Sequence, residues 1–163
     1  MSGLASWSAS ERLAELGIVL PVAAAPVANY VATVRTGSLL VVSGQLPLIE
    51  GRLAANGKLG GGITVEAGAA AARQCMINVL AQVQAALGRG CGLGSVKRVV
   101  RLGGFIACTP DFIQHATVMN GASDLAVAVF GEAGRHARST IGVPSLPLDA
   151  PVEVEALFEI ESW

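Results

Sequence analysis

A two-residue alternation runs through Val152-Glu153-Val154-Glu155-Ala156-Leu157-Phe158-Glu159-Ile160. Successive side chains of a β-strand point to opposite faces, so the even-numbered residues, all apolar, share one face. The odd-numbered face carries three glutamates and Leu157. We therefore expect a strand whose even face builds the core of a sheet. Its odd face needs a cover, which we expect the subunits of an oligomer to supply.

The segment before this strand carries an arginine at the head of a short apolar run, Arg138-Ser139-Thr140-Ile141-Gly142-Val143. This run predicts a strand, and a loop with three prolines follows it. The chain is 52% hydrophobic and only 14% charged, and an unpaired buried charge is costly. The Arg138 guanidinium therefore needs an anionic partner, either a small-molecule ligand or a structural salt bridge to Glu153 or another glutamate across the sheet.

The N-terminal third of the chain predicts one short helix and one hairpin. Ser8 to Leu16 is typical of an amphipathic helix with a serine cap. Two β-rich runs, Tyr30 to Arg35 and Leu39 to Gln45, flank the turn signal Thr36-Gly37-Ser38, which favours a hairpin. The segment from Gly51 to Gly62 holds five glycines and few apolar anchors, so it is either a loop or a weak additional hairpin.

Two longer helices and a strand are predicted in the middle of the chain. Thr64 can cap a helix whose apolar residues recur at helical spacing until Gly88 stops it. Val96 to Ile106 is the next strand. Thr109-Pro110-Asp111 combines a hydroxyl cap, a proline at the first helical position and an acid in the first turn. A second helix should therefore begin there and run toward Phe130.

The order of these elements indicates the fold class. Strand, strand, helix, strand, helix, strand, strand is typical of an α+β fold with two helices on one side of a mixed sheet. The pair Asn120-Gly121 is a candidate kink in the second helix. At 163 residues the chain is expected to form a single domain, residues 1–163, with residues 1–20 as a helical extension.

The composition argues against several classes of protein. A net charge of −1 disfavours nucleic-acid binding, which relies on clustered positive charge. The longest uncharged stretch, between Glu15 and Arg35, contains prolines and is too weakly apolar for a membrane span. No secretory signal is visible, so we expect a cytoplasmic location. Three cysteines and two histidines lie without ligand spacing, so neither a disulfide framework nor a metal site is expected.

Three motifs match a known protein family in order and approximate spacing. They are Val41-Val42-Ser43-Gly44-Gln45-Leu46-Pro47-Leu48, Arg138-Ser139-Thr140 through Leu146-Pro147, and Val152-Glu153-Val154-Glu155-Ala156. Together they resemble the RidA/YjgF family, also labelled endoribonuclease L-PSP, and the resemblance covers about Pro26 to Glu161. Ala28-Asn29-Tyr30-Val31-Ala32 departs from the family's Gly-Pro-Tyr-Ser-Gln, so the chain resembles a divergent subgroup with an additional N-terminal helix.

The resemblance implies a chorismate-mutase-like α+β fold and a homotrimer whose three sheets form a central barrel. It also implies ligand sites in the clefts between subunits, where a small-molecule carboxylate would bind. The implied activity is hydrolysis of reactive 2-enamino and 2-imino acids, such as 2-aminoacrylate, to 2-keto acids and ammonia. Such an enzyme is a hydrolase acting on C–N bonds, and it needs no cofactor.

The resemblance also assigns roles to individual residues. Arg138 would hold the substrate carboxylate through two parallel hydrogen bonds, a geometry that suits a guanidinium. Glu153 would orient water or move a proton, and Tyr30 would donate to the ligand from the wall of the cleft. Thr140 stands where the family usually has a cysteine. The expected substrate contacts besides Arg138 are Ser43, Gly44, Thr140 and Asn120.

Plainer interpretations of these residues stay open. Glu153 is also readable as a solvated glutamate, because nothing within its strand prefers it over Glu155. Tyr30 is also readable as a packing residue, Ser43 as a strand end, and Asn120 as a helix breaker. Two rival functions remain for the whole protein: non-catalytic binding of 2-keto acids, and RNA cleavage, which the charge balance disfavours.

Overall fold

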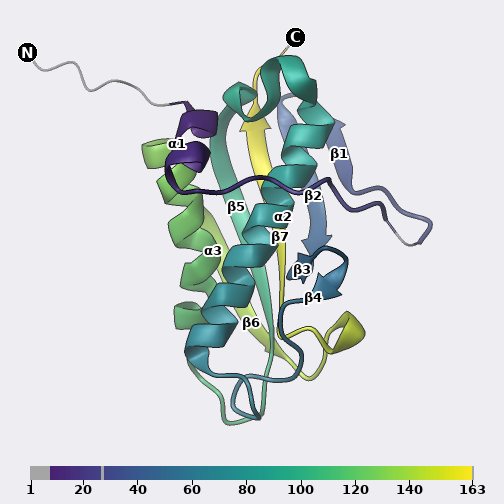
Figure 1. The fold of residues 1–163 in the computed structure, drawn as a ribbon, viewed down its shortest axis with the longest axis vertical. Helices are drawn as coiled ribbons and strands as arrows, with labels where there is room; N and C mark the ends of the chain where they lie inside the picture. The colour runs from purple at the N-terminus through teal and green to yellow at the C-terminus, as the bar shows by residue number, and fades with distance from the viewer. Residues whose placement is uncertain (1–7, 27, 163) are drawn as a thin grey trace, which may run out of the picture.

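The computed structural model describes residues 8–26 and 28–162, and a five-stranded sheet with helices on one side dominates it (Figure 1). Residues 1–7 of the predicted N-terminal extension lie outside the described residues. The helices are α1 (Ala9–Glu15), α2 (Val65–Cys91) and α3 (His115–Phe130). The strands are β1 (Thr33–Thr36), β2 (Leu39–Gln45), β3 (Leu48–Ile49), β4 (Arg52–Leu53), β5 (Val96–Ala107), β6 (Ala137–Val143) and β7 (Val152–Ile160). Short 3₁₀ turns lie at Gly92–Ser95, Gly131–Gly134 and Pro147–Asp149.

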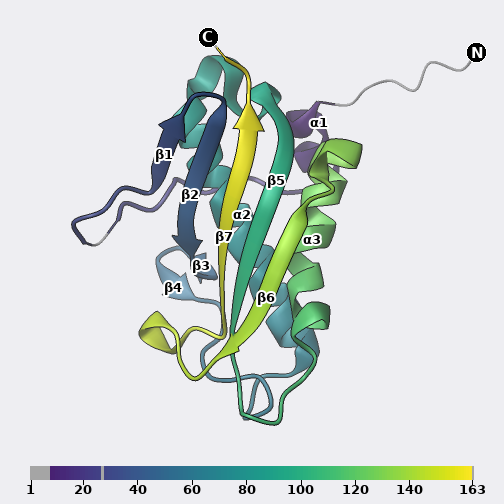
Figure 2. The same cartoon turned by 180° about the vertical axis from the view of Figure 1, so that it is seen from behind.

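The large sheet is mixed, and its strands lie in the order β1-β2-β7-β5-β6. β5 and β6 are parallel, whereas the other neighbouring pairs are antiparallel. α2 and α3 pack on one face of the sheet, and Figure 2 shows the opposite face, which no described helix covers. The predicted α+β fold, a mixed sheet with two helices on one side, is confirmed.

β7 lies in the middle of the sheet and follows the alternation predicted for it. Its even-numbered residues from Val152 to Ile160 are buried, and the residues between them are half-buried. The fully buried Phe158 places its ring centre 6.3 Å from that of Phe130, at an angle of 64° between the ring planes. This is an edge-to-face contact. The core therefore lies between the even face of β7 and the two long helices.

The open face of the sheet carries apolar side chains. Val34 pairs with Val41, and Val41 pairs with Leu157, so these three residues form a row across β1, β2 and β7. Val34 is 52% exposed and Val41 is 44% exposed. Large apolar side chains grouped on a surface are typical of a contact with another molecule. The row is therefore a candidate contact surface for another molecule.

α1 forms where the sequence predicts it. The Glu11 amide donates to the Ser8 hydroxyl at 3.2 Å, and the Ser8 amide donates to the Glu11 carboxylate at 2.7 Å. This reciprocal pair is a capping box, which satisfies two amides that the helix leaves free. After α1 the chain crosses α2 (Figure 1), where Gln82 Nε2 donates to the Ala24 carbonyl at 2.8 Å. Ala9 and Leu13 of α1 are buried, so the described part of the N-terminal extension is packed on the rest of the fold.

β1 starts later than predicted, at Thr33 rather than at Tyr30. The chain bends from Ala28 to Tyr30, and the Tyr30 amide donates to the Ala28 carbonyl at 2.9 Å. The segment around Tyr30 is therefore a turn that leads into the sheet. Gly51 lies in the turn of a two-stranded hairpin, β3 with β4, so a weak additional hairpin forms at the start of the Gly51 to Gly62 segment. The rest of that segment is a loop with an isolated bridge at Leu59.

α3 begins at His115, so the predicted helix start at Thr109-Pro110-Asp111 is wrong. The Thr109 amide donates to the Leu59 carbonyl at 3.0 Å, which continues the pairing of β5 instead of opening a helix. The Phe112 amide then donates to the Thr109 carbonyl at 3.1 Å and closes a turn. A contact distant in sequence has therefore overridden a favourable local helix signal.

Two glycines in the helices behave differently from each other. Gly88 has a φ of +76°, so the regular part of α2 ends there, as predicted. Gly121 does not kink α3, and the predicted break at Asn120-Gly121 is wrong. A β-carbon at Gly121 would overlap the backbone carbonyl of Ala69 in α2. Gly121 therefore permits the close approach of the two long helices.

Candidate functional site

Arg138 lies on β6, at the edge of the sheet, and its side chain reaches α3. Its Nη1 donates to the Asn120 side-chain oxygen at 2.9 Å and to the Ser123 hydroxyl at 3.0 Å. Its Nη2 donates to the Ala116 carbonyl at 3.3 Å. The three acceptors come from positions spaced four and three residues apart, which lie on one side of a helix. α3 therefore fixes the position of the guanidinium.

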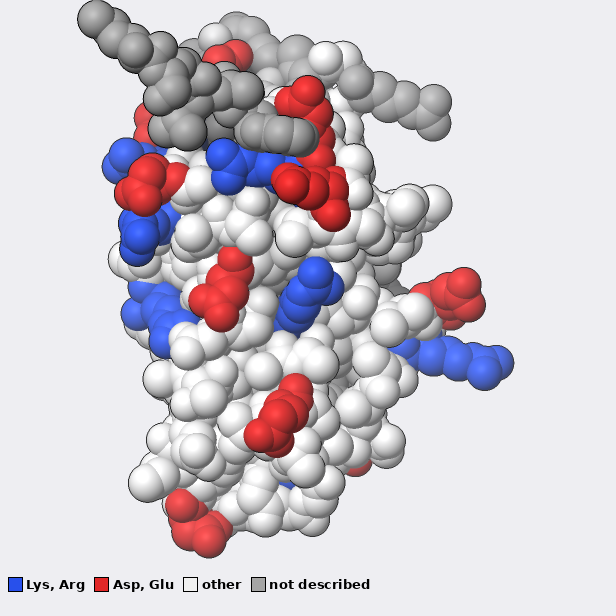
Figure 3. Space-filling model, turned by 60° about the vertical axis from the view of Figure 1, so that its left-hand side comes forward, with Lys and Arg blue, Asp and Glu red and all other residues white. Residues whose placement is uncertain are grey.

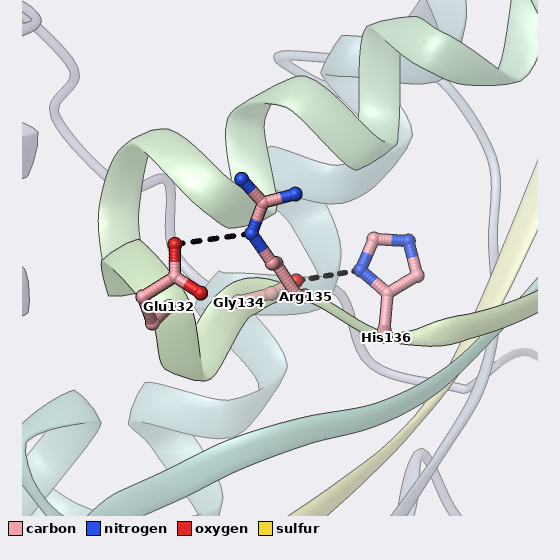
Figure 4. Close-up of polar contacts among 4 residues, drawn as sticks. All are labelled: Glu132, Gly134, Arg135 and His136. Carbon is pink, nitrogen blue, oxygen red and sulfur yellow. Dashed lines mark hydrogen bonds and ion pairs between the residues drawn. The ribbon is translucent and has the colours of Figure 1, made fainter.

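The acceptors that hold Arg138 are all neutral. Among the residues that the structure describes, no carboxylate lies within 4.0 Å of its guanidinium. The ion pair found in the described part of the chain joins Arg135 Nε to Glu132 Oε1 at 3.1 Å (Figure 4). The alternative of a structural salt bridge from Arg138 to Glu153 is wrong within one chain, because β5 separates their two strands. The charge of Arg138 thus has no anionic partner within the described chain.

A chain of hydrogen bonds continues from Arg138 to His136. Figure 4 shows His136 Nδ1 beside the Gly134 carbonyl, at 2.6 Å. Because a carbonyl only accepts, Nδ1 must carry a proton. With one proton on the ring, Nε2 accepts from the Ser123 hydroxyl at 2.9 Å, which leaves the Ser123 oxygen to accept from Arg138. We call Arg138, Asn120, Ser123 and His136 the arginine cluster.

The sequence prediction included Arg138 and Asn120 but missed Ser123 and His136. Part of the signal was present, because His136 precedes Arg138 by two residues and residues two apart share a side of a strand. Ser123 gave no such signal. Ser123 lies opposite Arg138 because of the way α3 is rotated about its axis against the sheet. The sequence of α3 alone does not determine that rotation.

Glu153 lies on the open face of the sheet, beside Gly44 of the neighbouring strand β2. A β-carbon at Gly44 would overlap the Glu153 carboxylate, so a residue without a side chain is needed there. Burial raises the pKa of Glu153 above its ordinary value, and the nearby charge of Glu155 raises it further. The Glu153 carboxyl group therefore keeps its proton to a higher pH than a fully solvated glutamate.

Tyr30 shares a cavity with Gly44, whereas Ser43 has a structural task. Tyr30 is 49% exposed and lines, together with Gly44, a cavity of about 160 Å³. The Ser43 hydroxyl donates to the Val31 carbonyl at 2.9 Å, so it secures the segment before β1. We call Glu153 and its neighbour Gly44 the glutamate cluster; the cavity that Tyr30 lines also includes Gln82 of α2.

Thr140 shares a side of β6 with Arg138, two residues away. Its hydroxyl oxygen is buried and lacks a hydrogen-bond partner among the described residues. The two clusters do not meet within one chain. The arginine cluster lies against α3, on the covered side of the sheet, and the glutamate cluster lies at the open face. The predicted catalytic residues Arg138 and Glu153 are therefore brought to different places.

The described residues, 8–26 and 28–162, show no group of three or more side chains placed to hold a metal ion. None of the helices described here is long and apolar enough to cross a membrane. Cys75 and Cys108 are free thiols, the former buried in α2 and the latter half-buried after β5.

Known proteins resemble this chain along almost its whole length. The family described as "YjgF/chorismate mutase-like, putative endoribonuclease" matches residues 10–160. Protein TCP17 of Trypanosoma cruzi is 50% identical over 163 residues, which cover 99% of this chain and all of that protein.

Solved structures show the same architecture. The protein Atu1372 of Agrobacterium tumefaciens, a protein of unknown function, is 46% identical, with a TM-score of 0.87 over 94% of this chain and 92% of that one. E. coli TdcF, solved with bound serine, is 26% identical, with a TM-score of 0.58 over 86% of this chain and 94% of that one. On this evidence, the chain belongs to the YjgF/chorismate mutase-like family.

Proposed function

We propose that the protein hydrolyses small 2-enamino and 2-imino acids to 2-keto acids and ammonia, at sites formed between copies of the chain in a homotrimer. The observation that carries this proposal is the surroundings of Arg138. Its half-buried guanidinium is held by neutral acceptors, and no described carboxylate balances its charge. A bound anion would stabilise a charge in this position.

The free donors of Arg138 suit a carboxylate. A guanidinium has five N–H donors, and the three hydrogen bonds to α3 leave Nε–H and one Nη2–H. Nε and Nη2 lie side by side, and a carboxylate can accept from such a pair through two parallel hydrogen bonds. The serine bound to E. coli TdcF shares with the proposed ligands a carboxylate next to a nitrogen-bearing carbon.

The glutamate cluster supplies an acid for the reaction. An enamine becomes an imine when it gains a proton at carbon, and this step needs a proton donor beside the ligand. The raised pKa of Glu153 suits that role, because the carboxyl group stays protonated to a higher pH. Once it has given up the proton, the carboxylate can take a proton from the attacking water.

The proposed reaction needs only water and proton transfers, and no cofactor. 2-Aminoacrylate gains a proton at its methylene carbon and becomes 2-iminopropanoate. Water adds to the imine carbon, and the resulting carbinolamine loses ammonia to give pyruvate. Arg138 holds the substrate carboxylate in every step. The reaction requires neither an oxidant nor a reductant.

A site that uses both clusters needs two copies of the chain. Arg138 and Glu153 lie at opposite faces of one sheet, so one copy cannot bring them to the same ligand. The apolar row of Val34, Val41 and Leu157 gives a second copy a surface to bury. In the proposed trimer, Arg138 of each copy meets Glu153 of the next.

The charge distribution gives RNA cleavage little support. Figure 3 shows basic and acidic side chains interspersed on one side of the molecule, with uncharged areas between them. The net charge is −1. Binding to nucleic acids relies on clustered positive charge that displaces counterions. The small-acid function therefore fits the chain better.

The proposal is tested by supplying 2-aminoacrylate from a pyridoxal-phosphate-dependent serine dehydratase and following the appearance of pyruvate. Wild-type protein should accelerate pyruvate formation above the spontaneous rate. Arg138→Ala should remove this acceleration. Arg135→Ala is the matched control, because Arg135 is exposed and paired with Glu132, and it should keep the wild-type rate.

Two outcomes would contradict the proposal. An Arg138→Ala variant with the wild-type rate would refute the role given to the arginine cluster. Wild-type protein that binds 2-keto acids saturably, without accelerating imine hydrolysis, would be a binding protein and not an enzyme.

A further inference from the structure

A second cavity lies where β5 and β6 end, beside the start of α3. Its volume is about 600 Å³, within the range of small-molecule sites. Among the residues that line the cavity are Lys58, Cys108, Phe112, His115 and Gly142. None of them belongs to the arginine cluster or to the glutamate cluster, so the cavity is separate from the residues proposed for imine hydrolysis.

Cys108 and His115 face each other in this cavity. Cys108 Sγ lies 3.4 Å from His115 Nε2, within hydrogen-bond distance for sulfur. The Phe112 ring stands edge-on to the imidazole, with ring centres 5.2 Å apart and an angle of 71° between the planes. This contact restrains the imidazole. A thiol with a restrained imidazole in reach is the arrangement of an activated cysteine nucleophile.

Gly142 of β6 makes room for this pair. A β-carbon at Gly142 would lie 2.5 Å from His115 Nε2 and 2.8 Å from Cys108 Sγ, too close for either atom to stay. Two side chains from different segments thus converge on a position where the strand has none. The thiol and the imidazole meet because the backbone leaves this space.

Lys58 adds a positive charge to the rim of the cavity. The Leu59 amide donates to the Ala107 carbonyl at 2.9 Å, and the Thr109 amide donates to the Leu59 carbonyl at 3.0 Å. These bonds tie the Lys58 segment to the chain that carries Cys108. No Asp or Glu is among the described residues that line the cavity. Its charge therefore favours anionic ligands.

We propose that Cys108 is a nucleophilic thiol with His115 as its base, and that the cavity accepts small anionic disulfides, which become joined to Cys108. His115 Nε2 takes the proton of the thiol, and Sγ attacks one sulfur of the ligand. A bond forms between Cys108 Sγ and that sulfur, the ligand's own S–S bond breaks, and the departing thiolate takes the proton from His115. Cys108 is thereby oxidised to a mixed disulfide, and the departing half is reduced to a thiol.

Cys75 provides the contrast within the same chain. It is fully buried in α2, and its Sγ donates to the Val152 carbonyl at 3.5 Å. Burial, with the charge of Glu153 as a smaller contribution, raises the pKa of the Cys75 thiol well above its ordinary value. Cys75 should therefore neither react with the disulfide nor displace it from Cys108.

Oxidised glutathione, a disulfide with several carboxylates, is the probe for this site. The full chain is incubated with it at neutral pH, and the modified peptide is identified by mass spectrometry. We expect one glutathione on Cys108 and none on Cys75. His115→Gln should slow the reaction on the order of tenfold, because the thiol loses its base. Gln114→Ala, an exposed neighbour whose side chain makes no capping bond, is the matched control and should react like wild type.

The charge of Lys58 is tested with a second disulfide. Lys58→Gln should slow the reaction with oxidised glutathione but not the reaction with the uncharged hydroxyethyl disulfide. Thermal unfolding of each variant checks that it is folded. Equal rates for folded wild-type and His115→Gln protein, attachment to a cysteine other than Cys108, or no attachment at all would overturn the proposal. None of these results depends on whether the protein hydrolyses imines.

Discussion

The arginine cluster and the glutamate cluster hold their charged groups in two different ways. α3 supplies three neutral acceptors to Arg138, so hydrogen bonds fix a group that stays charged. Glu153 is held by close packing against Gly44 and by partial burial, which raises its pKa. A cation that binds an anionic ligand, such as Arg138, thus needs directed hydrogen-bond partners. An acid that exchanges protons, such as Glu153, needs a poorly solvated position.

The largest loss of stability should come from Gly121→Ala, because this substitution disturbs the packing of α3, the helix that holds the arginine cluster. The added β-carbon would overlap the Ala69 carbonyl and separate α3 from α2. We expect the free energy of unfolding, measured in urea, to fall by about 3 kcal/mol. Gly62→Ala is the control, because nothing lies within 4 Å of its added carbon. A Gly121→Ala protein as stable as that control would show that α3 is not held where we describe it.

Gly44→Ala should strike the glutamate cluster alone. The new β-carbon would displace the Glu153 carboxylate, at a stability cost of about 2 kcal/mol. Imine hydrolysis should fall on the order of a hundredfold, as expected when a general acid is lost. Gly94→Ala, whose added carbon meets open space, serves as the control. Retention of full activity by folded Gly44→Ala protein would remove Glu153 from the proposed chemistry.

Ser123→Ala should weaken the hold of the arginine cluster on the substrate. It removes one of the two acceptors at Arg138 Nη1 and breaks the link to His136. A hydrogen bond contributes about 1 kcal/mol, so KM for the imine should rise roughly fivefold with little change in kcat. Ser123→Thr keeps the hydroxyl and should restore most of the loss. An unchanged KM in Ser123→Ala would mean that Asn120 and Ala116 suffice to position the guanidinium.

The smallest effect should appear in the pH dependence of stability. A carboxyl group whose pKa is raised by folding binds its proton more tightly in the folded state. Its stabilising contribution is therefore complete below the ordinary pKa of 4.5 and is lost as the pH rises through the raised value. Glu153→Gln removes this dependence, so its free energy of unfolding should fall less than that of wild type across that rise. Parallel curves for the two proteins would contradict the raised pKa.

Regular local sequence patterns correctly predicted the strand and the helix in which they occur. The alternation in β7 and the helical spacing after Thr64 act over neighbouring residues, and the structure confirms both. The start of α3 was missed because the Thr109 amide binds the distant Leu59 carbonyl. No local helix signal carries information about a partner that lies fifty residues earlier in the chain.

The sequence named some residues of the candidate site but not how they are arranged. The family motifs pointed to Arg138 and Glu153, and Gly44 does lie beside Glu153. They did not tell that Arg138 faces α3, because β6 is an edge strand in which neither side is buried throughout. The rotation of α3, which places Ser123 opposite Arg138, is set by packing against α2 at Gly121.

The central claim is that Arg138 and Glu153 act on one ligand from different copies of the chain. Arg138→Ala and Glu153→Gln chains, each carrying a different affinity tag, would be co-expressed, and assemblies with both tags isolated and assayed. Each variant alone should be inactive. A mixed trimer should regain about one third of wild-type activity, because a symmetric ring of either composition contains one site with both residues intact. Mixed assemblies as inactive as the separate variants would contradict the claim.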